Sequence, residues 1–423
     1  MKRVKIYITI ALLFTSIISI NAQQLTLDEC HTKAKQHYPA IAQYNIIEQS
    51  KDFDIKNANM AYLPQISLGA QATWQSDITK IDIDIPVPKD IDIPVPDKDQ
   101  YKVTAEVNQL IWDGGVIGAQ KKMATADAEL QKHKLETELY TLKERVNNLY
   151  FGILLLDERL QLHYLLEKEL ERNYDRVKSY VANGVANEAD LSAVKVEQLK
   201  SKQDRVEMES SRKAYIKMLS IFIGEELGDK TKLTKPLAND VNSLVIQRPE
   251  LQMFDAQQDL INSQKDVLTS KNLPKIGAFA QGGYGKPGLN MFDNKFKTYL
   301  VGGVRLSWNF GNLYTYSNDK RKIDLQQAML ETNRETFIHN VSIVIPQQQI
   351  EIEKYREQMK DDNEIISLRK LIREAAEAKV ENGTMTVSDM LKEMTAEEAA
   401  KQAKVLHEIQ YLMSIYKLKY TTN

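Results

Sequence analysis

Two short stretches of the chain match each other: Tyr62-Leu63-Pro64-Gln65-Ile66 and, 210 residues later, Asn272-Leu273-Pro274-Lys275-Ile276. Each opens a run in which apolar and polar residues alternate, which is typical of a β-strand with one apolar face. The same order of motifs surrounds both stretches. The further pairs are Tyr38-Pro39-Ala40-Ile41 with Arg248-Pro249-Glu250-Leu251, Leu110-Ile111-Trp112-Asp113-Gly114-Gly115 with Leu306-Ser307-Trp308-Asn309-Phe310-Gly311, and Asn183-Gly184 with Asn382-Gly383.

This duplication predicts two structural repeats, 23–235 and 236–423, each made of a helix, two strands, a long helix and a further helix. The strands are expected at about 66–75, 101–112, 276–285 and 298–308. Alternating runs of this length match the strands of membrane β-barrels. The half-buried hairpin of a soluble protein alternates in the same way, so the pattern alone leaves both alternatives open. The third strand is the weakest, because Phe279 falls on its polar side.

The number of predicted strands, four in one chain, limits how the chain can form a membrane barrel. The smallest membrane barrels use about eight strands, so the four in this chain are too few to close one. An open sheet edge is not viable in lipid, because its backbone groups have no hydrogen-bond partners there. If the strands span a membrane, several chains must therefore share one barrel, and three chains would supply twelve strands.

The helical segments are too long for a globular core. Gly114–Ala182 contains no proline, and its 69 residues reach roughly 100 Å as a helix. Within it, apolar residues from Leu135 to Leu160 follow 4-3 spacing, which is typical of a coiled-coil seam. The second copy, about Asn312–Glu381, contains Pro346, which marks either a bend or a split. Shorter helices are expected at Leu25–Ala61, Glu188–Gly224, Pro249–Lys271 and Thr386–Lys419. Asp240–Gln247 is a candidate extension of the third of these helices.

Residues 1–22 have the features of a signal peptide. Lys2, Arg3 and Lys5 precede the apolar run Ile6–Ile18, and Ile20-Asn21-Ala22 suits cleavage. An uncleaved N-terminal anchor is the alternative. The sequence therefore predicts an exported protein, and no later segment is apolar enough to span a bilayer as a helix.

Composition excludes several classes of function. Without the three signal-peptide cations the formal net charge falls from −2 to −5, which gives no reason to expect nucleic-acid binding. The single cysteine, Cys30, rules out an internal disulfide, and we expect a buried helix residue there rather than a lipid anchor. The six histidines lack ligand spacing. Gly283-Tyr284-Gly285-Lys286-Pro287-Gly288 has dinucleotide-loop spacing, but no helix follows it. We therefore predict no catalytic, metal or cofactor site, and no enzyme.

The whole pattern resembles the TolC-type outer-membrane efflux protein family (outer-membrane factors). The resemblance rests on the ordered motifs above, with Leu25-Thr26-Leu27-Asp28-Glu29 at the expected mature start. It implies a mainly α fold with β: a homotrimeric barrel, four strands per chain and twelve in the trimer, continuous with a long α-helical coiled-coil tunnel. It also implies an outer-membrane location in a Gram-negative bacterium, with the helices in the periplasm. The implied function is the exit duct of a tripartite efflux or type I secretion system.

The resemblance further implies partners and site residues. The partners would be a periplasmic adaptor protein, an inner-membrane pump and outer-membrane lipid, and the adaptor would dock on the two helical tips. The tip residues are Asn183, Gly184, Val185, Asn382, Gly383 and Thr384. In this family, acidic residues that begin the helix after the second tip can ring the closed mouth. Asp389 fits that position, but Lys392 stands where a second acid is expected. We hypothesise that Asp389 and Lys392 pair across protomers and that Met385 and Met390 narrow the mouth; a solvated helix face is the alternative.

An exported coiled-coil spacer or adhesin without a pore is the rival function. It accounts for the heptads but not for the duplicated strand pairs. Within the channel class, drug efflux, metal efflux and protein secretion stay open, although Met385, Met390 and Met394 suit soft metals as well as packing. The acidic, proline-containing loop 77–100 suits either a variable surface loop or a receptor site.

Overall fold

The computed structural model describes residues 24–79, 95–238 and 244–423, so the predicted signal peptide and most of the loop 77–100 lie outside the described residues. The chain forms two compact units. The helical unit comprises Met1–Ala42, Leu135–Pro249 and Glu335–Asn423, and the sheet unit comprises Gln43–Lys134 and Glu250–Arg334. Each unit takes segments from both predicted repeats. The compact units are therefore not the sequence repeats, whose boundaries stay a prediction.

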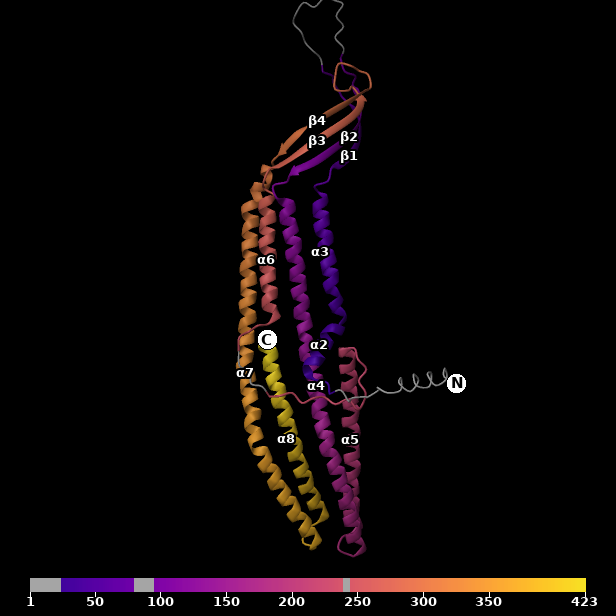
Figure 1. Cartoon of the computed structure of the whole chain (residues 1–423), viewed down its shortest axis with the longest axis vertical. Coiled ribbons are helices and arrows are strands. Elements are labelled where there is room, and N and C mark those ends of the chain that lie inside the picture. Colours follow the sequence, from indigo (N-terminus) through magenta and orange to yellow (C-terminus); the bar gives the residue numbers. More distant parts are fainter. Residues whose placement is uncertain (1–23, 80–94, 239–243) are drawn as a thin grey trace, which may run out of the picture. The chain divides into compact units, whose positions relative to one another are not determined.

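The sheet unit contains one antiparallel sheet in the order β1-β2-β3-β4 (Figure 1). Its strands are β1 Gln65–Trp74, β2 Asp99–Trp112, β3 Lys275–Lys286 and β4 Lys297–Ser307. Each strand begins and ends within two residues of its predicted position, which confirms four strands per chain. Because β2 pairs with β3, the central ladder of the sheet joins the two repeats.

The register places the alternating residues on two chemically different faces. One cross-strand row joins Leu68, Ala105, Gly282 and Leu300, and the opposite face carries rows such as Ser67, Glu106, Gln281 and Val301. The apolar face is exposed in the single chain, since Leu68 is 82% exposed and Leu300 is 75% exposed. A contiguous apolar surface of this kind needs an apolar partner.

The predicted helix Leu25–Ala61 is wrong as a single helix. The structure has α2 Leu27–His37, a 3-10 turn at Pro39–Ala42, and α3 Gln43–Met60. The break has a local cause, because the residue before a proline is pushed out of the helical region. Tyr38 accordingly has ψ 127°.

The other helices match the predicted segments closely. They are α4 Val116–Ala182, α5 Glu188–Ile223, α6 Pro249–Ser270, α7 Leu313–Glu381 and α8 Val387–Thr422, with a 3-10 turn at Phe310–Asn312. Pro346 does not split the second long helix, since α7 runs through it. The candidate extension of α6 is not helical at residues 244–247, and its remaining residues lie outside the described part. None of the helices within the described residues is long and apolar enough to cross a membrane.

The heptad seam of α4 forms the core of the helical unit. Leu135, Leu139, Leu142, Val146, Leu149 and Ile153 are all at most 7% exposed. Beside the seam, the Tyr150 hydroxyl lies 2.8 Å from the Leu25 carbonyl oxygen and 2.7 Å from that of Thr234. Tyr150 thus ties the N-terminal segment to the connector between the repeats.

Cys30 belongs to the same core. It is fully buried in α2, which confirms the expected buried helix residue, and burial raises the pKa of its thiol to about 12. A thiol with this pKa stays protonated and inert at neutral pH.

The adjacent glycines Gly282 and Gly283 provide a test of the sheet register. A Cβ on Gly283 would lie 2.2 Å from the Tyr299 ring, whereas a Cβ on Gly282 would meet nothing within 4 Å. We expect Gly283→Val to lower the free energy of unfolding by about 1–3 kcal/mol, as overpacking does, and Gly282→Val to change it by less than about 0.5 kcal/mol. Urea unfolding of the detergent-solubilised protein measures both values. Equal effects of the two substitutions would contradict the register.

Candidate functional site

The two helical hairpins of the helical unit end in the same backbone structure. After α4, Gly184 adopts φ 75°, and the Val185 amide donates to the Tyr180 carbonyl at 2.9 Å. After α7, Gly383 adopts φ 70°, and the Thr384 amide donates to the Lys379 carbonyl at 2.9 Å. These are Schellman caps, in which a left-handed glycine lets the backbone close the helix.

Side chains complete both turns in parallel. Asn183 and Asn382 each donate through Nδ2 to the carbonyl four residues earlier, at 2.8 Å in both cases. The next helix is capped by Asn187 in one hairpin, with Asp190 as its partner, and by Thr386 in the other, with Asp389 as its partner. All six predicted tip residues are exposed at these two turns. The two turns therefore share one backbone structure, and they differ in the exposed side chain after the glycine, which is Val185 in the first turn and Thr384 in the second.

Asp389 and Lys392 pair within one chain. Lys392 Nζ donates to Asp389 Oδ1 at 2.8 Å, and the side chains of Lys392 and Asp389 are 73% and 45% exposed, respectively. The hydrogen bond from Lys392 is the main cause of the lowered pKa of Asp389, and it raises the pKa of Lys392 in turn. Asp389 also accepts a bond from the Thr386 hydroxyl at 2.8 Å. The pairing of Asp389 and Lys392 across protomers stays a prediction.

Met390 lies differently from the hypothesis, whereas the place of Met385 at the mouth stays a prediction. Met390 and Met394 are buried, and they pack with Leu170 and Val177 in the apolar cluster behind the tips. Met390 is thus turned into the hairpin and cannot line an opening, while Met385 is half-buried against the same cluster. Among the described residues no group of His, Cys, Asp or Glu is arranged to hold a metal ion. The structure therefore explains these methionines by packing.

An ionic network centred on Arg373 of α7 was not predicted from the sequence. Its side chain is 12% exposed and contacts Glu169 of α4 at 3.0 Å, Glu377 of α7 and Glu397 of α8. Lys401 also binds Glu397, at 2.7 Å. The network joins the two hairpins. Only the i,i+4 spacing of these residues within each helix was visible in the sequence, because the partners across helices depend on packing.

The pKa values of Glu397 and its neighbour Glu398 are shifted in opposite directions. Burial alone would raise the pKa of Glu397, but hydrogen bonds from Lys401 and Arg373 outweigh it, so the pKa is lowered. Burial dominates at Glu398 and raises its pKa. Glu398 lines a cavity of about 210 Å³ between α4, α5 and α8, together with His163 and Ser201.

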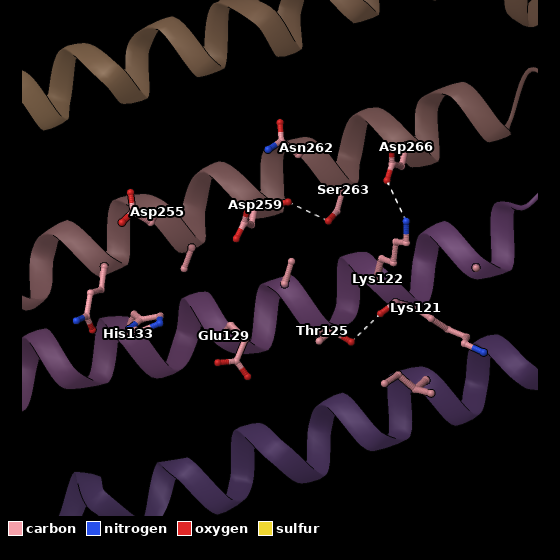
Figure 2. A pocket seen from close by; sticks show the side chains of 15 residues that line it. Lys121, Lys122, Thr125, Glu129, His133, Asp255, Asp259, Asn262, Ser263 and Asp266 are labelled. Carbon is pink, nitrogen blue, oxygen red and sulfur yellow. Dashed lines mark hydrogen bonds and ion pairs between the residues drawn. The ribbon is translucent and has the colours of Figure 1, made fainter.

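The sheet unit has a larger groove, of about 900 Å³, between α4 and α6 (Figure 2). Its lining includes exposed acidic side chains of α6 and Lys122 of α4, which lies 3.7 Å from Asp266. Thr125 and Ser263 turn back to carbonyls of their own helices. The described residues that line the groove do not converge as a catalytic group would, and we assign it no ligand.

The opposite shifts of the two glutamates predict opposite pH dependences. The lowered pKa of Glu397 stabilises the fold above the ordinary value of 4.5, and this stability is lost as the pH falls through the folded-state pKa. The raised pKa of Glu398 has the opposite effect on stability. Its ionised form lowers the free energy of unfolding at neutral pH, and this loss disappears below pH 4.5.

We therefore expect Glu397→Gln to lower the free energy of unfolding at pH 7 by about 2 kcal/mol, because it removes hydrogen bonds between charged groups. Glu398→Gln should raise the free energy of unfolding at pH 7, by less than about 2 kcal/mol. Both differences from wild type should shrink as the pH falls to 4. Urea unfolding at pH 4 and pH 7 measures them, and effects of the same sign at pH 7 would contradict the assignment.

Comparisons with known proteins agree with this architecture. Residues 31–224 match the family model described as outer membrane efflux protein. No curated protein matches the sequence significantly.

Several solved structures share the fold. The CmeC outer-membrane channel of Campylobacter jejuni is 14% identical with a TM-score of 0.64, covering 94% of this chain and 85% of its own. The VceC outer-membrane protein of Vibrio cholerae is also 14% identical, with a TM-score of 0.63 and 94% of both chains covered. The MtrE outer-membrane channel of Neisseria gonorrhoeae is 13% identical, with a TM-score of 0.67 over 96% of this chain and 93% of its own.

The family match covers most of the first repeat, and the shared fold extends over nearly the whole chain. Residues 31–224 are thus similar to the outer membrane efflux protein family, and nearly the whole chain has the fold of solved outer-membrane channels.

Proposed function

We propose that three copies of this chain close one twelve-stranded barrel in the outer membrane and form the exit duct of a tripartite efflux or secretion system. One observation carries the proposal: the chain has a four-stranded sheet whose exposed apolar face ends in two edge strands, β1 and β4. Lipid can cover the apolar face, but it cannot satisfy the edge backbone groups. Pairing β4 of one protomer with β1 of the next supplies those hydrogen bonds and leaves no edge.

The two hairpin tips are the proposed docking surface for a periplasmic adaptor, which connects the duct to an inner-membrane pump. Support comes from their exposure and from their matching caps around Gly184 and Gly383. In a trimer these turns would form six similar units at one end of the helical part. An adaptor could then bind with the same surface at both types of site.

The mass of the mature protein, extracted from outer membranes in mild detergent, tests the trimer. Light scattering corrected for bound detergent should give three times the chain mass, with circular dichroism showing both α and β structure. A water-soluble monomer or dimer would mean that the strands never close, and the spacer or adhesin function would replace the channel.

Asp389 and Lys392 are the proposed charged ring at the periplasmic mouth, with Met385 beside them. Their exposure close to the tip supports this placement. Replacing Lys392 with Asp would add two negative charges per chain to the ring's net charge. We expect Lys392→Asp to raise cation selectivity or change the resting conductance in planar bilayers.

Lys200→Asp on α5 is the matched control. Lys200 pairs with Glu197 at i,i+3 and 2.8 Å, just as Lys392 pairs with Asp389. The control should leave both quantities at wild-type values. If Lys392→Asp also leaves both unchanged, the ring proposal is wrong, while the trimeric duct is untouched.

A further inference from the structure

The polar face of the sheet has an unbalanced charge. In the four described strands this face carries four cationic residues and one carboxylate: Lys102, Lys275, Lys297, Arg305 and Glu106. Lys297 is neutralised by Asp293 of the adjoining loop. Three cations thus face one anion, a net charge of +2 per chain, although the chain as a whole is slightly acidic.

Aromatic rings hold two of these cations over the face. The Lys102 ammonium lies 5.3 Å from the Tyr299 ring centroid, and Tyr299 in turn lies over Gly283. The Arg305 guanidinium lies 4.6 Å from the Phe279 ring centroid. Phe279 is the residue that broke the alternation of β3, and the structure gives it the role of supporting Arg305. Such contacts fix a cation in place without cancelling its charge.

The single carboxylate does not offset this arrangement. Glu106 lies 4.0 Å from Arg305 and 3.4 Å from the Gln281 amide nitrogen, so its charge is shared among donors of the same face. Lys275 and Arg305 lie toward the helical end of the strands, and Lys102 lies toward the loops. A solute moving along this face therefore meets a cation at both ends.

A cavity at the loop end of the polar face is also lined by cationic and neutral polar side chains. Its volume is about 420 Å³, and its lining includes Lys102, the amides of Gln71 and Gln100, and the Thr73 hydroxyl. None of the described residues that line it is acidic. Ammonium, amide and hydroxyl groups are hydrogen-bond donors that suit carboxylate, sulfate or phosphate oxygens.

We propose that the strand section of the duct favours anions, and that the exported cargo class it suits is anionic small molecules. This inference rests on the proposed function, because only a closed barrel turns the polar face into the wall of a pore. Three chains then place a net +6 around it. A charged passage with low-dielectric walls focuses the field and concentrates ions of the opposite sign.

Reversal potentials in a KCl gradient across planar bilayers test the proposal. The charge-removing variant Lys102→Gln/Arg305→Gln should lower the chloride-to-potassium permeability ratio by about twofold or more, as loss of a focused field predicts. Glu106→Gln removes the opposing charge and should raise the ratio. The charge-conserving variant Lys102→Arg/Arg305→Lys is the matched control and should keep the wild-type ratio. All variants share one periplasmic mouth, so differences between them report the strand section.

The outcomes separate the two proposals. Ratios that move in opposite directions for the charge-removing variant and Glu106→Gln support the anion-favouring section. Equal ratios in the charge-removing and charge-conserving variants, with wild-type conductance, overturn it and leave the duct intact. Absence of any conductance from trimeric wild-type protein overturns the duct, and with it this inference. If the charge-removing variant does not assemble, Glu106→Gln and the control decide the question by the same ratio.

Discussion

The backbone groups along the outer edges of β1 and β4 have no strand partner among the described residues of this chain, and the rest of the structure depends on that fact. An edge in water can be tolerated or protected by charges. An edge beside an exposed apolar face cannot be placed in lipid alone. In the proposed membrane location the sheet is therefore complete only when chains associate, which is the reason for proposing a shared barrel.

The two predicted repeats contribute similar elements to the structure. The central β2–β3 ladder joins strands from the two repeats, and each long helix returns through a glycine cap of the same geometry. The two hairpins differ where charge is concerned. Lys392 follows Asp389 in the second hairpin, whereas the corresponding position of the first, Ala193, is uncharged. The two turns thus share a backbone structure but differ in charge, which fits the proposal that both dock an adaptor and that only the second contributes charge to the mouth.

Charge is distributed differently in the two units. In the helical unit, Arg373 and Glu397 hold helices together through a buried network whose members are paired. On the polar face of the sheet, Lys102 and Arg305 are held by aromatic rings and keep their charge available. The carboxylates balance the cations of the network, whereas Glu106, 4.0 Å from Arg305, leaves an excess of positive charge on the face. This difference is the basis for proposing that the strand section favours anions.

The sequence by itself determined the four strands, their two faces, the long helices and the glycine turns, because each depends on local periodicity or on one residue's backbone preference. Even the break of the predicted helix Leu25–Ala61 is encoded locally, because Pro39 forces Tyr38 out of the helical region. Only the tertiary structure decided that Tyr150 bridges Leu25 and Thr234, that Met390 is buried, and that Arg373 meets Glu169 and Glu397. Those contacts join helices far apart in the chain, and no spacing within one helix specifies which side chains of another will face it.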